Sequence, residues 1–352
     1  MPGKRAGRLH IEIRNPMNRA LILVGLLCVV ALVAGVYLIA REPPMSLSTV
    51  EVEEAPSFHA LIFRYDTEFS SVEQLELLIA QDAELGLRAS AFPLPEEFRT
   101  RRNVLFEYSQ RTGEVQLHAR PMPWGLTNAD TGWADWTPYQ YGFLDMDQVL
   151  ESYYHNLLPE ISIFEFNGFN PEGVSLHSTS NRLPWSDDIN YRIIGAAAAH
   201  AGLSWVSVTS QAFSVGPDRT KTDVSRFNNY DSEITNRQRG PWIRVPTGWG
   251  STKSTLVIPT SWRDAYSEES TGLKDPREIY ALMREDIDRH WKVAREEGLP
   301  LVLLIHPVYR VGVEVQSELF FNFRRDLLDE ARRLGVPVMT LSEYANRVAA
   351  MQ

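Results

Sequence analysis

The stretch Leu61-Ile-Phe-Arg-Tyr-Asp-Thr-Glu-Phe69 decides how the rest of the chain is interpreted. A short apolar run ends there in three charged residues, Arg64, Asp66 and Glu68, and an amphipathic segment follows at once. In α/β proteins the carboxyl ends of parallel strands face the ligand crevice, so two acids at the end of a first strand are candidates for a catalytic base or a metal ligand. Neighbouring carboxylates repel each other, and a metal ion or Arg64 would relieve that repulsion. Taken alone, the segment is more often a strand end with solvated acids.

Strands and helices are expected to alternate after this stretch. We expect strands at 60–66, 87–94, 114–119, 161–166, 174–177, 204–209, 242–245, 255–258, 301–305 and 336–341, of which 161–166 and 174–177 are alternatives for one core strand. We expect helices at 71–85, 96–110, 145–158, 186–202, 275–297, 317–334 and 342–351. Such alternation predicts an α/β fold with a parallel sheet. Seven or eight strand-helix units favour a closed barrel over a doubly wound sheet.

The N-terminal region predicts a membrane anchor. Residues 1–19 form a basic tail of net charge +4, and residues 20–40 contain no charged side chain. Twenty-one uncharged residues in a helix span about 30 Å, the thickness of the hydrocarbon core of a bilayer. Because the basic cluster precedes the apolar run, the tail is expected to be cytoplasmic. Residues 41–57 are expected to be a linker, and the domain 58–352 is expected to lie in the periplasm or outside the cell.

Composition excludes some partners. The chain has a net charge of -10, so with +4 in the tail the remainder carries -14, which argues against nucleic acid. The single Cys28 lies inside the apolar run and excludes a disulfide within the chain. We find no internal repeat and no glycine-rich phosphate loop.

Three histidines stand at the predicted carboxyl ends of strands. His118 ends Gly-Glu-Val-Gln-Leu-His, His177 ends Gly-Val-Ser-Leu-His, and His306 follows Leu-Leu-Ile. A single histidine at such a place is usually structural. Three of them converging with Asp66 and Glu68 favour a polar functional site at one end of the barrel.

These residues resemble the polysaccharide deacetylase superfamily, which consists of metal-dependent carbohydrate esterases on an irregular (β/α)7 barrel. The similarity covers about residue 60 to the C-terminus, and its most specific segments after the opening strand are RASAFPL, GEVQLH, GLPLVLLIHPV and GVPVMTLSEYANRV. The family opens with Asp-Asp or, in some branches, Asp-x-Glu, and Asp66-Thr67-Glu68 is similar to the latter. The resemblance implies that Asp66 is the general base, Glu68 and His118 are metal ligands, and His306 is the general acid. His177 falls where some branches place a histidine of their third motif.

One element of the family pattern is missing. The second motif, His-[Ser/Thr]-x-x-His, supplies two metal ligands, but the position that matches the second histidine after His118 is Met122, a poor ligand in a site of oxygen and imidazole donors. If residues 177–181 are the second motif instead, Asn181 replaces that histidine. The register on His118 is preferred because Glu114 precedes it by four residues, as in the family. His177 or Asp66 then completes the metal shell, or the metal is weakly bound or lost.

The resemblance implies a deacetylase that removes N-acetyl groups from an envelope polysaccharide or peptidoglycan with a divalent metal, zinc being expected. The apolar run 20–40 adds that this deacetylase is membrane-anchored and extracytoplasmic. Arg64, Trp124 and Asn181 are expected to bind substrate. The alternative is a catalytically inactive deacetylase-like protein that binds glycan or scaffolds an envelope assembly, which the missing imidazole and the many loop aromatics favour. A barrel glycosidase would need two carboxylates about 5 to 9 Å apart and would leave the histidines unexplained.

The charge asymmetry around residues 20–40 leads to a prediction of topology. Alkaline phosphatase fused to the C-terminus should be active, because the domain is expected outside the cytoplasm. A silent phosphatase fusion beside a bright cytoplasmic reporter at the same position would show that the orientation is reversed.

Overall fold

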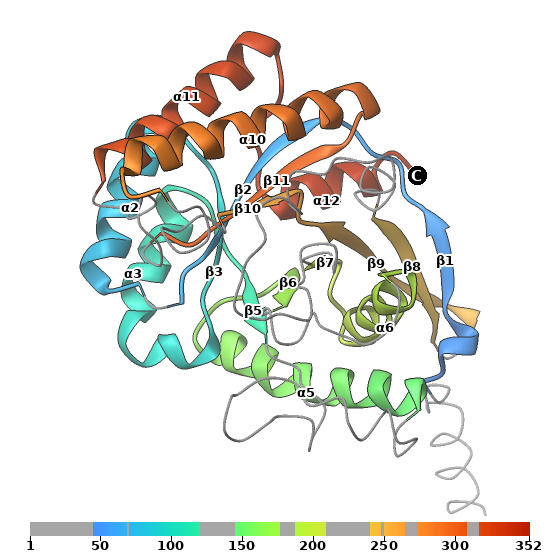
Figure 1. Cartoon of the computed structure of the whole chain (residues 1–352). Helices are drawn as coiled ribbons and strands as arrows, with labels where there is room; N and C mark the ends of the chain where they lie inside the picture. The colour runs from blue at the N-terminus through green and yellow to red at the C-terminus, as the bar shows by residue number, and fades with distance from the viewer. Residues whose placement is uncertain are drawn as a thin grey trace, which may run out of the picture. The chain divides into compact units, whose positions relative to one another are not determined.

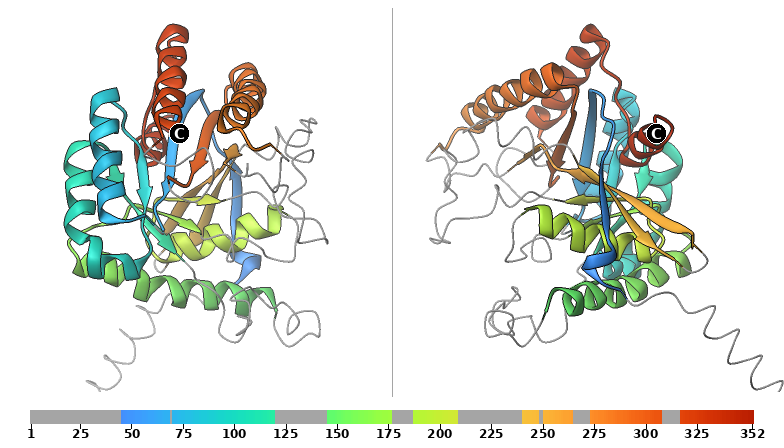
Figure 2. Two further views of the ribbon diagram at one scale, coloured as in Figure 1. Left: turned by 60° about the vertical axis from the view of Figure 1, so that its left-hand side comes forward. Right: turned by 90° about the vertical axis from the view of Figure 1, so that its right-hand side faces the viewer.

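The computed structural model describes residues 45–68, 70–119, 145–176, 187–208, 240–247, 250–264, 273–307 and 317–352. Apart from the short segment Pro246–Ser251, these residues belong to one compact unit. Figures 1 and 2 show this unit as a set of strands flanked by helices. Within Pro246–Ser251, the backbone N–H of Thr247 donates a hydrogen bond of 2.8 Å to the carbonyl of Ser251.

The strands of the unit form two sheets, and two segments of the chain run from one sheet into the other. One sheet has the order β10-β11-β2-β3-β4, and its strands are Trp262–Arg263, Pro300–Ile305, Ala60–Asp66, Ser90–Phe92 and Glu114–Val115. The other has the order β1-β8-β9-β7-β6-β5, with strands Glu51–Glu54, Pro241–Pro246, Thr252–Pro259, Trp205–Val208, Gly173–Leu176 and Leu117–Ala119. The first strand of this second sheet, β1, pairs antiparallel with β8.

Two short interruptions join these sheets into a ring. Only Gln116 separates β4 from β5, and only Thr260 and Ser261 separate β9 from β10, so each of these segments passes from one sheet into the other. Among the described residues the parallel pairs therefore close through β9–β10, β11, β2, β3, β4–β5, β6 and β7. The predicted α/β fold with parallel sheets is confirmed.

The side chain of Gln116 stabilises one interruption. Its amide nitrogen donates to Ser342 Oγ at 3.1 Å, and its amide oxygen accepts from the backbone N–H groups of Glu172 and Gly173 at 2.9 and 3.2 Å. One buried amide thereby ties the point where the strand changes sheets to the start of β6 and to the C-terminal helix. A buried amide needs such partners, because an unmatched polar group in the core is costly.

Helices follow several of the parallel strands, and the residues at their ends explain where they begin and end. The helices are α2 Val72–Leu85, α3 Phe98–Arg111, α5 Met146–Phe166, α6 Asp187–His200, α10 Pro276–Glu297, α11 Glu318–Leu334 and α12 Leu341–Ala349, with short 3₁₀ turns at Leu47–Thr49 (η1) and Pro95–Glu97 (η2). Ser71 and Thr340 begin α2 and α12 with capping boxes. Gly298 ends α10 with φ of 65°, a left-handed conformation that glycine adopts without steric cost.

Alternation along β2 separates two cores. Leu61, Phe63 and Tyr65 belong to the larger core, which includes the apolar faces of the surrounding helices. Ala60 and Ile62 belong to a second core inside the ring. This inner core also contains Phe92, Trp205, Leu256, Val302 and, from α12, Leu341, Tyr344 and Val348. The next positions on the inner face of β2 are Arg64 and Asp66, so the ring is apolar at the end that α12 covers and polar at the carboxyl ends of the strands.

A buried ion pair fixes the outer face of β2. Arg324 of α11 pairs with Asp82 of α2, and both side chains have 0% exposure. The same guanidinium donates to Tyr65 Oη at 3.1 Å, and Tyr108 Oη donates to Asp82 at 3.4 Å. Burial raises the pKa of Asp82 to about 6, although the charge of Arg324 opposes this rise. The pair thus joins two helices to the strand that ends in Asp66.

Three segments differ from the sequence prediction. Residues 161–166 were expected to be a strand, but α5 continues past Pro159 to Phe166. Phe164 is fully buried against Phe98 at a ring distance of 4.6 Å, so packing of one helical face overrides the β propensity of this run. Residues 336–341 form only an isolated bridge between Val338 and Leu61, because α12 begins at Leu341.

The third difference lies in the segment expected to be a linker. Residues 45–54 contain η1 and β1 and are bound to the domain. Asp147 accepts hydrogen bonds from the Ser46 hydroxyl at 2.8 Å and from the Leu47 backbone at 2.7 Å, and Arg192 donates to the Leu47 carbonyl at 2.9 Å. Residues 45–54 therefore belong to the folded unit, which was expected to begin at residue 58.

No helix in the described part of the chain is long and apolar enough to cross a membrane. The predicted anchor at residues 20–40 lies outside the described residues.

The buried ion pair predicts a large effect on stability. Asp82→Asn should lower the free energy of unfolding by about 3–5 kcal/mol at pH 7.5, because it leaves Arg324 charged and buried without a counter-ion. Asp329→Asn on α11 is the matched control, since its pair with Arg332 is 60% exposed on both sides and should contribute at most about 1 kcal/mol. Urea denaturation of both variants would measure the difference, and equal losses would contradict this role of Asp82.

Candidate active site

The candidate site begins with Arg64 and Asp66 on the inner face of β2. Nε and Nη2 of Arg64 donate to the two oxygens of Asp66, both at 3.1 Å. Nη1 donates to Ser207 Oγ of β7 at 3.1 Å and to Thr260 Oγ1 after β9 at 3.0 Å. The guanidinium is 1% exposed and lies 5.3 Å from the centre of the Phe92 ring. Arg64 thus fixes Asp66 from beneath, inside the ring.

Glu68 and His118 lie beside Asp66. His118 is on β5, the second half of the strand that changes sheets at Gln116. Its Nδ1 is 3.1 Å from Glu68 Oε2, and its Nε2 is 3.8 Å from Asp66 Oδ2. All three side chains are buried, with residue exposures of 5% or less. The site therefore places two acids and an imidazole together out of bulk water.

His306 enters the site from the end of β11. Its Nε2 lies 3.9 Å from Asp66 Oδ2 and 3.9 Å from Glu68 Oε1. On its other side, Nδ1 is 2.7 Å from Asp264 Oδ1, and the backbone N–H of His306 donates to Asp264 Oδ2 at 2.7 Å. Because an ionised carboxylate only accepts, Nδ1 carries the proton in this pair, and Nε2 faces the acids. Asp264 consequently fixes both the orientation and the tautomer of His306.

The electrostatics of the site favour protonated imidazoles. Burial lowers the pKa of His306, but the charge and hydrogen bond of Asp264 and the charges of Asp66 and Glu68 outweigh burial, so its pKa is raised above 6.5. Burial likewise lowers the pKa of His118, and the charges of Glu68 and Asp66 raise it further than burial lowers it. A histidine with a raised pKa is suited to donate a proton near neutral pH.

The donor set also fits a divalent metal ion. Asp66, Glu68 and His118 each offer one ligand atom, and these atoms lie within 4.8 Å of one another. Carboxylate oxygens with an imidazole nitrogen are the donors that zinc and similar ions take. Asp66, Glu68 and His118 therefore fit the divalent metal ion that the family resemblance implies.

The structure brings together four predicted residues: Asp66, Glu68, His118 and His306. Arg64, predicted to bind substrate, lies buried beneath the carboxylates. His177, Trp124 and Asn181, as well as Met122, lie outside the described residues, so their assignments stay predictions.

Sequence reasoning missed Asp264, Ser207 and Thr260. The predicted strand 255–258 ended too early, and its continuation through β10 places Asp264 at a strand end, as His306 is. Applying the strand-end criterion to the sequence Ser-Trp-Arg-Asp would have found it. The two hydroxyl groups carry no comparable signal, because serine and threonine are common in and after strands.

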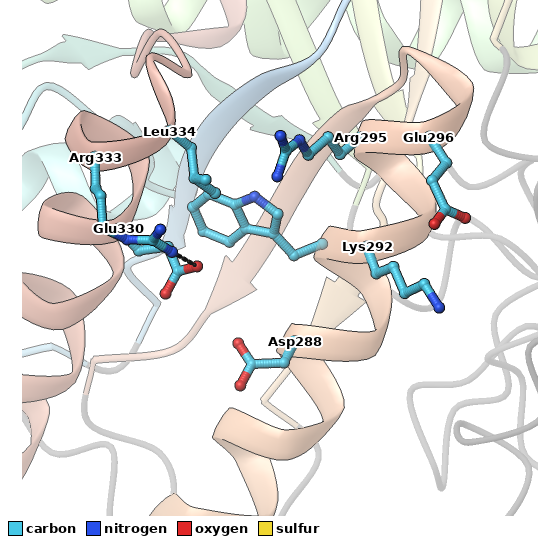
Figure 3. A pocket seen from close by; sticks show the side chains of 8 residues that line it. Asp288, Lys292, Arg295, Glu296, Glu330, Arg333 and Leu334 are labelled. Atoms are coloured by element: carbon cyan, nitrogen blue, oxygen red, sulfur yellow. Dashed lines mark hydrogen bonds and ion pairs between the residues drawn. The ribbon is translucent and has the colours of Figure 1, made fainter.

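Another hollow, of about 620 Å³, lies between α10 and α11 (Figure 3). Its lining contains charges of both signs, and three of the six charged lining residues form ion pairs. Arg284 on the neighbouring turn contacts Asp288 and Glu330 at 2.9 Å, and Arg333 contacts Glu330 at 2.9 Å. None of its lining residues belongs to the cluster around Asp66. The paired charges make it a poor candidate for chemistry.

Solved structures similar to this chain include polysaccharide deacetylases. A protein provisionally named a polysaccharide deacetylase from Mycobacterium smegmatis is 16% identical, with a TM-score of 0.47, over 86% of this chain and 96% of its own. A mutant of the peptidoglycan deacetylase PdaC from Bacillus subtilis is 12% identical, with a TM-score of 0.36, over 84% of this chain and 92% of its own.

A protein described as a pseudoenzyme also occurs among these neighbours. A CE4 family pseudoenzyme from Bacillus anthracis is 9% identical, with a TM-score of 0.39, over 81% of this chain and 65% of its own. No family model and no curated protein matches the sequence. Polysaccharide deacetylases, the family that the sequence resembles, are thus among the solved structures similar to this chain.

The contact between Asp264 and His306 predicts a measurable change in titration. Asp264→Asn should lower the pKa of His306, because it removes the carboxylate that contributes most to raising it. Nitrogen-15 NMR of the imidazole in chelator-treated protein would measure this, with the signal of the exposed His155 as a reference. An unchanged titration of His306 would contradict the role of Asp264.

Proposed function

We propose that this protein is a membrane-anchored, extracytoplasmic, divergent polysaccharide deacetylase that hydrolyses N-acetyl groups of an envelope glycan. The observation that carries the proposal is the cluster of Asp66, Glu68, His118 and His306, in which acids and imidazoles meet at the carboxyl ends of parallel strands. Amide hydrolysis needs a group that accepts a proton from water and a group that gives a proton to the leaving amine. In the cluster, Nε2 of His306 lies 3.9 Å from Oδ2 of Asp66, so a proton donor and a proton acceptor are neighbours.

Asp66 suits the role of general base. It is buried, and its carboxylate is fixed by Arg64, so its free lone pairs face His118 and His306. A base that is already positioned loses little entropy when it accepts a proton. Its place at the end of β2 agrees with the role that the family resemblance implies.

His306 suits the role of general acid. Its Nε2 faces the cluster, and Asp264 holds the opposite side of the ring. Although burial opposes it, the charge and hydrogen bond of Asp264 and the charges of Asp66 and Glu68 raise the pKa of His306 and so favour the protonated imidazole. Because 14% of the side chain is exposed, a substrate can approach it. His306 thus combines a proton to give with access to an incoming amide.

Glu68 and His118 would hold a divalent ion, which we expect to be zinc. Such an ion would lower the pKa of a water molecule and polarise the amide carbonyl. Either His177 or Asp66 would complete the metal shell.

The proposal also covers the substrate of the protein and its location in the cell. An N-acetylated hexosamine polymer, either an envelope polysaccharide or peptidoglycan, is the substrate class of the family. The solved neighbour from Bacillus subtilis carries the name of a peptidoglycan deacetylase. Residues 20–40 would anchor the domain to the outer face of the membrane, with the basic tail in the cytoplasm.

The alternative is a catalytically inactive protein that binds glycan or scaffolds an envelope assembly. It is supported by Met122, which stands where the family places a histidine, and by the pseudoenzyme among the solved neighbours. The pairing of His306 with Asp264 favours the enzyme, because a receptor has no need of an oriented proton donor.

The proposal predicts metal-dependent release of acetate from N-acetylglucosamine oligomers by the full-length protein. A chelator should abolish the activity, and zinc or cobalt should restore it. His306→Ala should reduce turnover by about 10²–10⁴-fold, the range for the loss of a positioned acid, and should leave the metal bound. His118→Ala should remove both the metal and the activity.

His155→Ala on the exposed face of α5 is the control, because that imidazole is 59% exposed and lies on another element. If the wild-type protein purifies without metal and releases no acetate when zinc is added, the deacetylase function is wrong and the glycan-binding alternative stands.

A further inference from the structure

We propose that an exposed apolar patch on α3 and α5, formed by Phe106, Ile163 and Phe166, docks onto the surface of the membrane that anchors the chain. The inference rests on the anchor at residues 20–40, which belongs to the proposed function. It goes beyond that function by giving the folded domain a contact with lipid of its own. The patch contains none of the residues of the candidate active site.

The patch lies where α3 meets the end of α5. Phe166 of α5 is 90% exposed, and Ile163, one turn before it, is 41% exposed. Phe106 of α3 is 46% exposed, and its ring lies 6.3 Å from that of Phe169, which follows α5. A phenylalanine with so much exposed surface is stabilised when an apolar phase covers it. Exposed apolar side chains that gather in one place mark contacts with membranes or other proteins.

Arginine side chains flank the patch and favour a membrane. Arg99 and Arg102 are exposed on α3 seven and four residues before Phe106, so all three lie on one face of the helix. Nε of Arg102 donates to the carbonyl of Asn167 at 2.9 Å, next to the end of α5 that carries Phe166. Rings beside cations suit the boundary of a bilayer, because the rings enter the acyl layer and guanidinium groups bind lipid phosphates. A second copy of the chain would instead bring the arginines of both copies together.

The start of the folded unit ties α5 to the end of the predicted anchor. Asp147 in the first turn of α5 accepts from the Leu47 backbone at 2.7 Å and from the Ser46 hydroxyl at 2.8 Å. The chain from residue 40 to Ser46 spans at most about 20 Å when extended. The 21 residues of α5 span about 30 Å, and Phe166 ends the helix. The anchor therefore tethers one end of α5 near the membrane, which raises the effective concentration of the patch at the other end.

Quenching by spin-labelled lipids tests the docking. The full-length protein with Cys28→Ser is placed in nanodiscs of phosphatidylcholine and phosphatidylglycerol that carry nitroxide groups. A fluorophore is attached through Ser162→Cys, an exposed position one turn before Phe166. The lipids should quench this fluorophore. They should leave a fluorophore on Asp326→Cys nearly unquenched, because α11 lies on the opposite side of the unit from α5 (Figures 1 and 2).

Phe166→Ser should lower the ratio of docked to undocked protein, measured by this quenching, by about tenfold or more. The reason is that full burial of a phenylalanine side chain in an apolar phase corresponds to at least this factor. Met351→Ser is the matched control, because this apolar side chain is 51% exposed at the C-terminus, outside the patch. It should leave the quenching at position 162 unchanged. Both substitutions replace exposed side chains, so unchanged thermal unfolding is expected for each.

Equal quenching at positions 162 and 326, or unchanged quenching in Phe166→Ser, would overturn the inference. Crosslinking between two copies through position 162, without quenching by lipid, would assign the patch to a second copy and would also overturn it. If the wild type does not stay with the nanodiscs, the anchor is wrong and the docking falls with it.

Acetate release from soluble N-acetylglucosamine oligomers separates this inference from the proposed hydrolysis. Phe166→Ser should release acetate as fast as the wild type, because the patch lies outside the cluster around Asp66. A wild-type protein that is quenched at position 162 but releases no acetate would support the docking and refute only the hydrolysis.

Discussion

The repulsion between Asp66 and Glu68 is the constraint on which the rest of the site depends. Two carboxylates this close and this buried carry a large desolvation penalty unless positive charge and hydrogen bonds compensate for it. The imidazoles of His118 and His306 lie within 3.9 Å of both acids. Arg64 in addition binds both oxygens of Asp66 from inside the ring. Asp66 therefore stands between a guanidinium that keeps its proton and imidazoles that can release theirs.

Strand β2 carries buried arginine contacts on both of its faces. On the inner face Arg64 holds Asp66, and on the outer face Arg324 joins Tyr65 to Asp82 of α2. Each arrangement is costly to break, because a charge would be left buried without its partner. Together they set the position of the strand whose end bears the acids, so the geometry of the site depends on residues that never contact a substrate.

The pairing of Asp264 with His306 links the site to the point where β9 becomes β10. Asp264 follows the end of β10, and Trp262 in that strand donates from its indole to Asp286 of α10 at 3.0 Å. The His306 ring is thus oriented through a short strand that is itself fixed to a buried helix residue. Such outer contacts commonly matter for function nearly as much as the groups that react.

The sequence by itself determined the class of fold and the core of the site. Alternating strand and helix patterns predict a parallel α/β fold, and polar residues at strand ends predict Asp66, Glu68, His118 and His306, because parallel strands carry their carboxyl ends to one side. Tertiary structure alone decided what those residues contact. Nothing local shows that Arg64 turns inward to Ser207 and Thr260, 143 and 196 residues away, or that Asp264 meets His306. The helical end of α5 likewise depends on packing of Phe164 against Phe98, which outweighs the local preference for a strand.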